Sequence, residues 1–224
     1  MRTYVHERVR QAPLDDKVRT KFDWREFVRL AHEGDEDGGR TLRDRIDTAR
    51  WYARIHLESL GKPGAARAAY LLNSRRALKV ALDVPGLEQN VRETAVSMSA
   101  SSDVPIARVH AHDPEHIWIV SDLVKPVKSE HEFFELTNID LSDLSAQLED
   151  LQAEKAAGRK ITKGFVGDET VWGAWRAVEE GELALLDVDE LGHWGVTPDR
   201  RVVLLDYGYT QEMYDSLPGF MRTR

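Results

Sequence analysis

The chain has 224 residues, of which 42% are hydrophobic and 31% are charged, and its formal net charge is -8. This length suits one large domain or two small ones with a substantial core. The negative charge argues against non-specific nucleic-acid binding, because that binding depends on Lys and Arg. The absence of cysteine excludes disulfides, thiolate catalysis and cysteine-based zinc sites. No apolar run approaches the roughly 20 residues that span a bilayer, and the first residues do not resemble a signal peptide, so we expect an intracellular protein with no membrane contact.

Two helices are predicted in the first sixty residues. Residues 15 to 31 place Phe22 and Phe27 at helical spacing, and the glycines and acids of residues 33 to 39 predict a loop. Thr41 is placed to cap a second helix that ends near residue 60. Its predicted apolar stripe comprises Leu42, Ile46, Ala49, Ala53 and Leu57.

Arginines recur along this second helix, and acids are interleaved with them. The arginines are Arg40, Arg43, Arg45, Arg50 and Arg54, and the acids are Asp44, Asp47 and Glu58. We interpret the segment as a solvated, ion-paired helix face rather than an anion-binding patch.

Strands are predicted in the middle of the chain and helices beyond it. The segments are strands 65–72 and 76–82, a helix 86–99, strands 106–112 and 116–123, helices 141–157 and 170–181, and a hairpin 194–205. This order predicts an α+β protein with two lobes. The expected division is a helical extension over 1–58, a strand-rich lobe over 59–126 and a reduced helical lobe over 127–224.

Several residue types in this pattern suit phosphate and metal binding. Gly61 and Gly64 precede the first strand, where glycines let backbone N–H groups approach phosphates closely. Lys79 lies between two apolar residues of the next strand, so it must find an anion or extend outward at an edge. Asp206 follows the last apolar strand, and a carboxylate at the exit of a buried hairpin is well placed to bind a metal ion.

In this order the elements resemble those of protein kinases. The resemblance rests on the glycines, Lys79 in its strand, the helix 86–99, the strand Trp118–Val124, and Asp206-Tyr207-Gly208 in place of Asp-Phe-Gly. The resemblance covers residues 60 to about 210, and it implies a two-lobed fold that binds ATP and magnesium.

The resemblance also implies roles for individual residues. Lys79 would hold the α- and β-phosphates, and a glutamate of the following helix, Glu93 or else Glu88, would orient Lys79. Asp122 lies in the strand that leads to the adenine-binding hinge of kinases. Asp206 would bind magnesium.

The catalytic loop departs from the kinase pattern. Val188 stands where the catalytic aspartate belongs, with Asp187 and Asp189 on either side as candidate bases, in what the sequence predicts to be an acidic loop. His193 takes the place of the asparagine that helps to bind magnesium, and histidine prefers softer metals. We therefore expect a pseudokinase, with an active, atypical ATP-dependent phosphotransferase as the alternative.

The sequences of several segments are similar to those of compact kinase-like proteins encoded by bacteriophages. The segments are Leu78-Lys79-Val80-Ala81, Gly86-Leu87-Glu88-Gln89-Asn90 and Trp194-Gly195-Val196. This resemblance implies an interaction or structural role in a phage particle or its assembly, with phage structural proteins as partners, in the host cytoplasm or the virion. The helical extension and an aromatic tail with Tyr209 and Tyr214 would supply the contact surface.

Three of the eight histidines lie close together, at His110, His112 and His116. On a hairpin they could form an imidazole cluster suited to zinc. We favour a polar hairpin tip that binds no metal.

Overall fold

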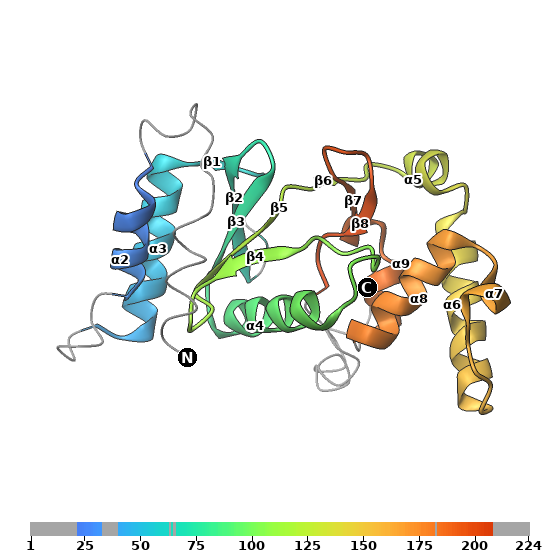
Figure 1. Ribbon diagram of the computed structural model, residues 1–224. Helices are drawn as coiled ribbons and strands as arrows, with labels where there is room; N and C mark the ends of the chain where they lie inside the picture. The colour runs from blue at the N-terminus through green and yellow to red at the C-terminus, as the bar shows by residue number, and fades with distance from the viewer. Residues whose placement is uncertain (1–21, 33–39, 63, 65, 182, 208–224) are drawn as a thin grey trace, which may run out of the picture. The chain divides into compact units, whose positions relative to one another are not determined.

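The computed structural model of the chain describes residues 22–32, 40–62, 64, 66–181 and 183–207. The chain divides into two compact units, one of residues 1–94 with 108–123, and one of residues 95–107 with 124–224. Helices and antiparallel strands occur in both units, so the α+β class is confirmed (Figure 1). Each unit is described by itself below.

The first unit begins with two helices, α2 (Trp24–His32) and α3 (Leu42–His56). The predicted cap of α3 is confirmed as a capping box. The Asp44 N–H donates to the Thr41 hydroxyl at 3.2 Å, and the Thr41 N–H donates to the Asp44 carboxylate at 2.9 Å. These bonds satisfy backbone groups that a helix start leaves unpaired. The predicted loop over residues 33–39 and the start of the first predicted helix lie outside the described residues.

The buried face of α3 differs from the predicted stripe at two positions. Leu42 is 37% exposed, because it occupies the first turn of the helix, while Tyr52 is buried in its core-facing stripe. Arg45 is 4% exposed and pairs with Glu115, so the expectation that it belongs to a solvated face is wrong. Arg43 does belong to a solvated, ion-paired helix face, because it is exposed and pairs with Asp47 at 3.0 Å.

A five-stranded antiparallel sheet forms the centre of the first unit, in the order β1-β2-β3-β5-β4. Its strands are β1 (Glu58–Ser59), β2 (Arg67–Asn73), β3 (Arg76–Ala81), β4 (Val109–His112) and β5 (Trp118–Asp122). Two predicted starts were early: β2 begins at Arg67 and β4 at Val109. Ile106 instead forms a parallel bridge with Leu204 in the second unit.

Alternate residues of the sheet pack with α2 and α3 in one apolar core. Figure 1 shows the two helices side by side, and the contacts place α3 on β2 and β3. The core joins Phe27 and Ile46 of the helices to Tyr70, Leu78 and Trp118 of the strands. The helical segment is therefore part of the first unit, since its apolar stripe and the sheet bury each other. The division of the chain differs in this respect from the three predicted parts.

Helix α4 (Val84–Ser99) follows β3, and it begins two residues before the predicted start. Gly86 lies so close to Ala66, the residue before β2, that a Cβ on it would meet the Ala66 carbonyl oxygen at 2.1 Å. Only glycine permits this approach, because every other residue carries a Cβ. The approach sets the first turn of α4 against the sheet.

The second unit combines short helices with a three-stranded antiparallel sheet. Its helices are α5 (Glu130–Thr137), α6 (Leu141–Ala156), α7 (Lys163–Val166), α8 (Glu169–Gly181) and α9 (Leu185–Asp189), with a 3₁₀ turn over Leu191–His193. Its sheet has the order β6-β7-β8, from β6 (Lys125–Pro126), β7 (Trp194–Val196) and β8 (Val202–Leu204). The predicted hairpin and the two longer helices are confirmed, whereas β6 was not predicted.

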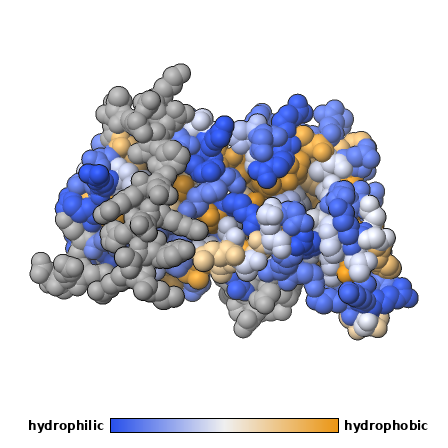
Figure 2. Space-filling view, in the orientation of Figure 1, coloured by the Kyte–Doolittle hydropathy of each residue, from blue (hydrophilic) through white to orange (hydrophobic). Residues whose placement is uncertain are grey.

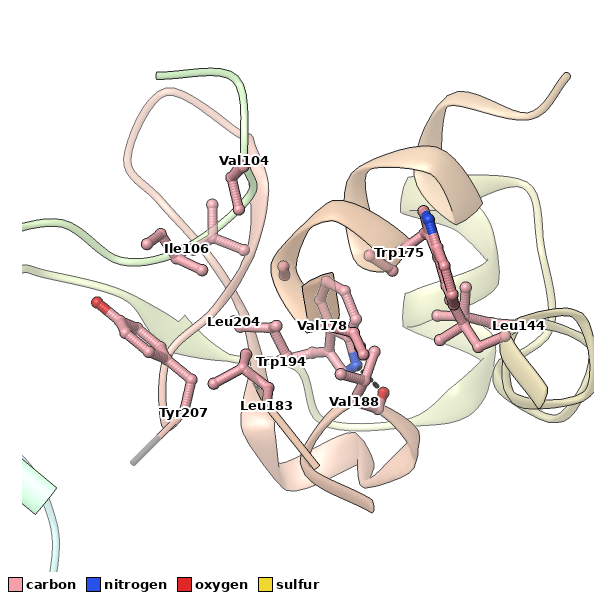
Figure 3. Close-up of a cluster of buried hydrophobic side chains, with 14 of the residues drawn as sticks. Val104, Ile106, Leu144, Trp175, Val178, Leu183, Val188, Trp194, Leu204 and Tyr207 are labelled. Carbon is pink, nitrogen blue, oxygen red and sulfur yellow. Dashed lines mark hydrogen bonds between the residues drawn. The ribbon is translucent and has the colours of Figure 1, made fainter. Parts of the chain in front are cut away.

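Large apolar side chains fill the second unit's own core (Figure 3). Leu144 is fully buried, Trp175 is 3% exposed and Trp194 is 1% exposed. The Trp194 indole N–H donates to the Val188 carbonyl oxygen at 2.7 Å. This bond satisfies the one polar group of a buried tryptophan and fixes α9 against β7.

The segment predicted as an acidic loop is helical instead. Residues 185–189 form α9 and residues 191–193 form the 3₁₀ turn. The cause is apolar burial within the acidic run: Val188 is completely buried, which holds the segment against the core.

None of the described helices is long and apolar enough to cross a membrane. On the face drawn in Figure 2, the described residues are mainly hydrophilic, with hydrophobic residues in small areas between them.

Candidate functional site

The clearest site in the first unit is an ion pair between β3 and α4. The Lys79 ammonium donates to both oxygens of Glu93, at 3.0 and 2.8 Å. The Glu93 side chain is completely buried, and the Lys79 side chain is 13% exposed. A buried carboxylate is stable only when it is paired and hydrogen-bonded. Glu93 therefore holds the end of Lys79 in one place. Glu88, the alternative partner, is exposed.

A second cation reaches the same carboxylate. The Arg67 guanidinium on β2 contacts the Glu93 Oε1 atom at 2.7 Å, and its side chain is only 8% exposed. Arg67 also donates to the Asn90 side-chain oxygen at 3.4 Å, while Asn90 donates to the His116 carbonyl oxygen at 2.8 Å. The Glu93 carboxylate thus holds two cations from neighbouring strands. The side chains of Arg67, Lys79 and Glu93 together carry one net positive charge.

The strand register puts Arg67 and Lys79 on the same face of the sheet. Ala69 is the cross-strand partner of Lys79, and Ala81 is the partner of Arg67. Side chains at alternate positions of a strand share a face, so Ala77 also lies beside Lys79. The face that carries the two cations thus holds these alanines and also Leu71, the cross-strand partner of Ala77.

The two candidate glycines lie in the connection between β1 and β2. Gly61 has a φ of +109° and an exposed backbone, a conformation that other residues rarely adopt. The Gly64 N–H donates to the Arg67 carbonyl oxygen at 2.9 Å, so this group is already used within the hairpin. Pro63, between the glycines, lies outside the described residues.

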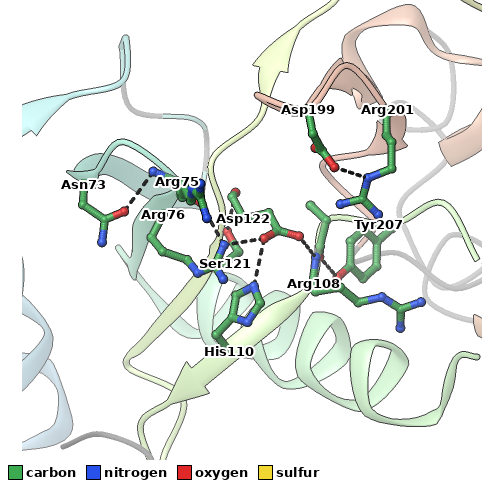
Figure 4. A network of polar contacts seen from close by, with 11 residues as sticks. Asn73, Arg75, Arg76, Arg108, His110, Ser121, Asp122, Asp199, Arg201 and Tyr207 are labelled. Carbon is green, nitrogen blue, oxygen red and sulfur yellow. Dashed lines mark hydrogen bonds and ion pairs between the residues drawn. The ribbon is translucent and has the colours of Figure 1, made fainter. Parts of the chain in front are cut away.

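Asp122, at the end of β5, belongs to a polar network on the sheet (Figure 4). Its carboxylate accepts from Arg76 at 2.7 Å and from the Arg108 N–H at 2.9 Å, and it lies 2.8 Å from the His110 Nε2 atom. Burial disfavours ionisation of the carboxylate, but the hydrogen bonds of His110 and Arg108 and the charge of Arg76 outweigh it and hold the pKa of Asp122 below its usual range. Asp122 therefore serves the sheet as an ionised carboxylate.

The remaining candidates belong to the second unit. Asp206 is partly buried after β8. The Leu205 N–H donates to the His193 carbonyl oxygen at 2.8 Å, so the backbones on which Asp206 and His193 stand lie side by side. Gly208 lies outside the described residues. Lys79 and Asp206 belong to different units, and each is described only within its own.

Asp189, one of the two candidate bases, ends α9. Burial and the negative charge of the neighbouring Glu190 raise the pKa of Asp189 above its usual range. A carboxylate with a raised pKa accepts a proton more readily, as a general base requires. The side chain of Asp187, the other candidate, lies outside the described residues.

The three clustered histidines are divided among different contacts. His112 and His116 stack with their ring centroids 4.8 Å apart, while His110 pairs with Asp122. Among the described residues, no three His, Cys, Asp or Glu side chains are grouped so as to hold a metal ion. These contacts fit a polar hairpin tip, and the expectation that the cluster binds no metal stays a prediction.

Comparisons with known proteins find similarity in structure and none in sequence families. No protein-family model matches the chain, and no curated protein matches it. The crystal structure of the kinase domain of Mycobacterium tuberculosis PknI is similar, with a TM-score of 0.38 and 18% sequence identity over 67% of this chain and 58% of that one. The chain thus spans a little over half the length of that kinase domain.

Arg67 and Asn90 are the site residues that sequence reasoning missed. The sequence held part of the signal for Arg67, a charged residue at the start of a largely apolar strand. Its place two residues before the cross-strand neighbour of Lys79 comes from the register of the sheet. Asn90 stands three residues before Glu93 on α4, close to one helical turn, and so lies on nearly the same face of the helix.

Proposed function

We propose that the chain is a kinase-like, nucleotide-binding protein in which Lys79 contacts the phosphates. The observation that carries the proposal is the paired geometry of Lys79 and Glu93, with the ammonium donating to both oxygens of a fully buried carboxylate. A lysine held in this way keeps its positive charge at one place on its face of the sheet.

The residues of the first unit fit the phosphate chain of ATP. Lys79 can give one of its hydrogen bonds to a phosphate oxygen while Glu93 keeps it in place, and Gly61 permits a close approach of backbone to ligand. Bound ATP would supply the transferable phosphoryl group. Magnesium fits less well, because it prefers oxygen ligands and His193 offers nitrogen. Asp206 is the one carboxylate that we assign as a ligand of magnesium.

We further propose that phosphoryl transfer is weak or absent, and that the protein acts as a pseudokinase scaffold. Supporting this, Val188 occupies the position expected for the catalytic aspartate and is completely buried in the apolar core. A side chain in that place cannot orient an attacking hydroxyl. Components of a phage particle or of its assembly are the partners that we propose for such a scaffold.

An active phosphotransferase is the second candidate, and the surroundings of Asp189 favour it. The raised pKa of Asp189 suits a general base. Transfer of radiolabel from ATP to the protein itself or to casein-like acceptors, abolished in Asp189→Asn, would establish this candidate. Absence of transfer under conditions where ATP binds would support the pseudokinase and contradict the active phosphotransferase.

A thermal-shift titration with ATP and magnesium tests nucleotide binding. Ligand at one hundred times its dissociation constant stabilises a one-site protein by about 2.7 kcal/mol, which corresponds to roughly 5–10 °C for a chain of this size. We expect Lys79→Met to abolish the shift, since it removes the charge that contacts the phosphates.

The matched control is Lys128→Met, which removes an exposed lysine of the second unit. This variant should keep the full shift. No shift in the unmodified protein, or an equal shift in Lys79→Met, would contradict nucleotide binding at this site. Circular dichroism of each variant separates loss of binding from loss of fold.

A further inference from the structure

The outer face of helix α3 exposes large apolar side chains. Trp51 is 52% exposed and Ile55 is 48% exposed, so both keep apolar surface in water that burial would remove at a gain in free energy. A hollow of about 430 Å³ lies beside Trp51 on the same face, and its lining residues are Arg40, Asp44, Asp47, Thr48 and Trp51. A tryptophan next to a hollow has the form of an interface anchor, because such anchors carry much of the binding energy of protein contacts.

The exposed residues of this face form one stripe along α3. The stripe runs through Asp44, Asp47, Trp51 and Arg54, which are all exposed and follow one another at intervals of three or four residues. Residues at these intervals lie on one face of a helix, and the buried residues of α3 lie on the opposite face. The intervals are those by which two helices pack along their length. The stripe therefore has the geometry of a helix–helix contact.

Charge is divided along the stripe, with the two acids in its N-terminal half and Arg54 at its C-terminal end. A second copy of α3, laid antiparallel about a two-fold axis at the level of residue 49, brings Asp44 opposite Arg54 of that copy. The same register brings Asp47 opposite Trp51 of the second copy. Because a two-fold interface uses the same patch twice, each of these contacts forms on both sides of the axis. The stripe is thus complementary to itself in charge.

We propose that the chain forms a homodimer through α3, in which Trp51 of each copy enters the hollow of the other. Asp47 lines that hollow, so the antiparallel register delivers the indole to it, and the indole N–H can donate to an exposed carboxylate there. Arg54 of one copy pairs with Asp44 of the other. The contact joins two helices of 15 residues, which is small for a protein interface, so the dimer forms reversibly. The inference does not depend on nucleotide binding.

Sedimentation equilibrium of the full chain, from micromolar to near-millimolar concentration, tests the inference. We expect the mass of the unmodified protein to rise with concentration from 25.5 kDa toward twice that value. Trp51→Ala should weaken association by about tenfold or more, since it removes the interface anchor. The matched control is Phe165→Ala, which removes an aromatic side chain of α7 that is 51% exposed. This variant should associate as the unmodified protein does.

A pair of charge-reversal variants tests the antiparallel register. Asp44→Lys and Arg54→Glu each place like charges opposite one another at both ends of the stripe, so each variant alone should associate several-fold more weakly at low salt. An equimolar mixture of the two can form a mixed dimer, which has the natural ion pair at one end and the reversed pair at the other. We expect the mixture to recover association. Recovery also shows that both variants fold, although Asp44 belongs to the capping box of α3.

Three results would overturn the inference. A mass of 25.5 kDa at every concentration would show that this face does not bind a second copy and is open to a different partner. A dimer that is equally strong in Trp51→Ala would place the interface elsewhere on the molecule. Failure of the mixed charge variants to associate, with both folds intact by circular dichroism, would exclude the antiparallel pairing of α3.

Discussion

Single buried carboxylates determine much of the local structure in the first unit. Glu93 is completely buried and joins α4 to β2 and β3 through two cations. Asp113 is also completely buried, and its Oδ2 atom accepts the N–H groups of Glu115 and Ile117 at 2.9 and 3.2 Å. In both cases a residue that usually lies at the surface is held inside by specific partners, because an unpaired charge there would be costly.

The pairing of His32 with Asp113 makes stability depend on pH. The two side chains lie 2.9 Å apart, and the hydrogen bond to Asp113, against burial and the charge of Arg45, raises the pKa of His32. A raised folded-state pKa means that stability is fully present below the unfolded-state pKa and is lost as pH rises through the folded one. We expect urea unfolding to show less stability at pH 8.5 than at pH 5.5, and His32→Gln to reduce that difference.

The control for this prediction is His131→Gln, which changes a histidine whose side chain is 81% exposed. Glu115 also faces His32 and reinforces its protonated form. An identical pH dependence in His32→Gln and in the unmodified protein would assign the effect to other groups.

At the scale of elements, helix α4 is positioned by a backbone contact rather than by a large side chain. Gly86 lets its first turn approach Ala66, the residue before β2, and Glu93 stands about two turns later on the same helix. The position of the ion pair therefore depends on a residue that touches neither cation.

Replacement of Gly86 should disturb both stability and binding. A Cβ at this position would meet the Ala66 carbonyl oxygen at 2.1 Å, so backbone must move. We expect Gly86→Ala to cost about 1–3 kcal/mol in urea unfolding, as overpacking usually does, and to reduce the thermal shift with ATP. Gly164→Ala is the control, because no atom lies within 4 Å of a Cβ built there. Equal stability of the two variants would show that the contact relaxes freely.

Sequence periodicity predicted the longer elements and missed the short ones. Helices α3, α4, α6 and α8 follow their patterns because several turns repeat the same apolar spacing. Two-residue β6 and five-residue α9 are too short to show a period, and α9 depends on burial of Val188. Lys79 and Glu93 were named from a resemblance, whereas Arg67 joins them through a strand register that one sequence does not reveal. The proposed roles of all these residues remain predictions.

At the scale of the whole molecule, the described residues form two apolar cores that have no residue in common. The first joins α2 and α3 to the five-stranded sheet. The second surrounds Leu144, Trp175 and Trp194. Because sites that share no partners usually contribute additively, a change in one core should act mainly on its own unit.

Leu144→Ala tests this separation, since Leu144 is completely buried in the second core. A leucine-to-alanine change in a core costs about 2–5 kcal/mol. We expect amide hydrogen exchange to accelerate in α6 and α8 and to stay unchanged in β2, β3 and β5. Leu78→Ala, in the first core, should produce the opposite pattern. Acceleration throughout the chain in either variant would mean that the two units unfold together.

The aromatic residues of the first core have a spectroscopic consequence. Trp24 of α2 and Trp118 of β5 meet edge to face, with ring centroids 5.1 Å apart. Two indoles at this separation couple their electronic transitions, and the resulting near-ultraviolet circular dichroism depends on their mutual angle. Docking of α2 on the sheet therefore carries an intrinsic optical signature, which needs no added label.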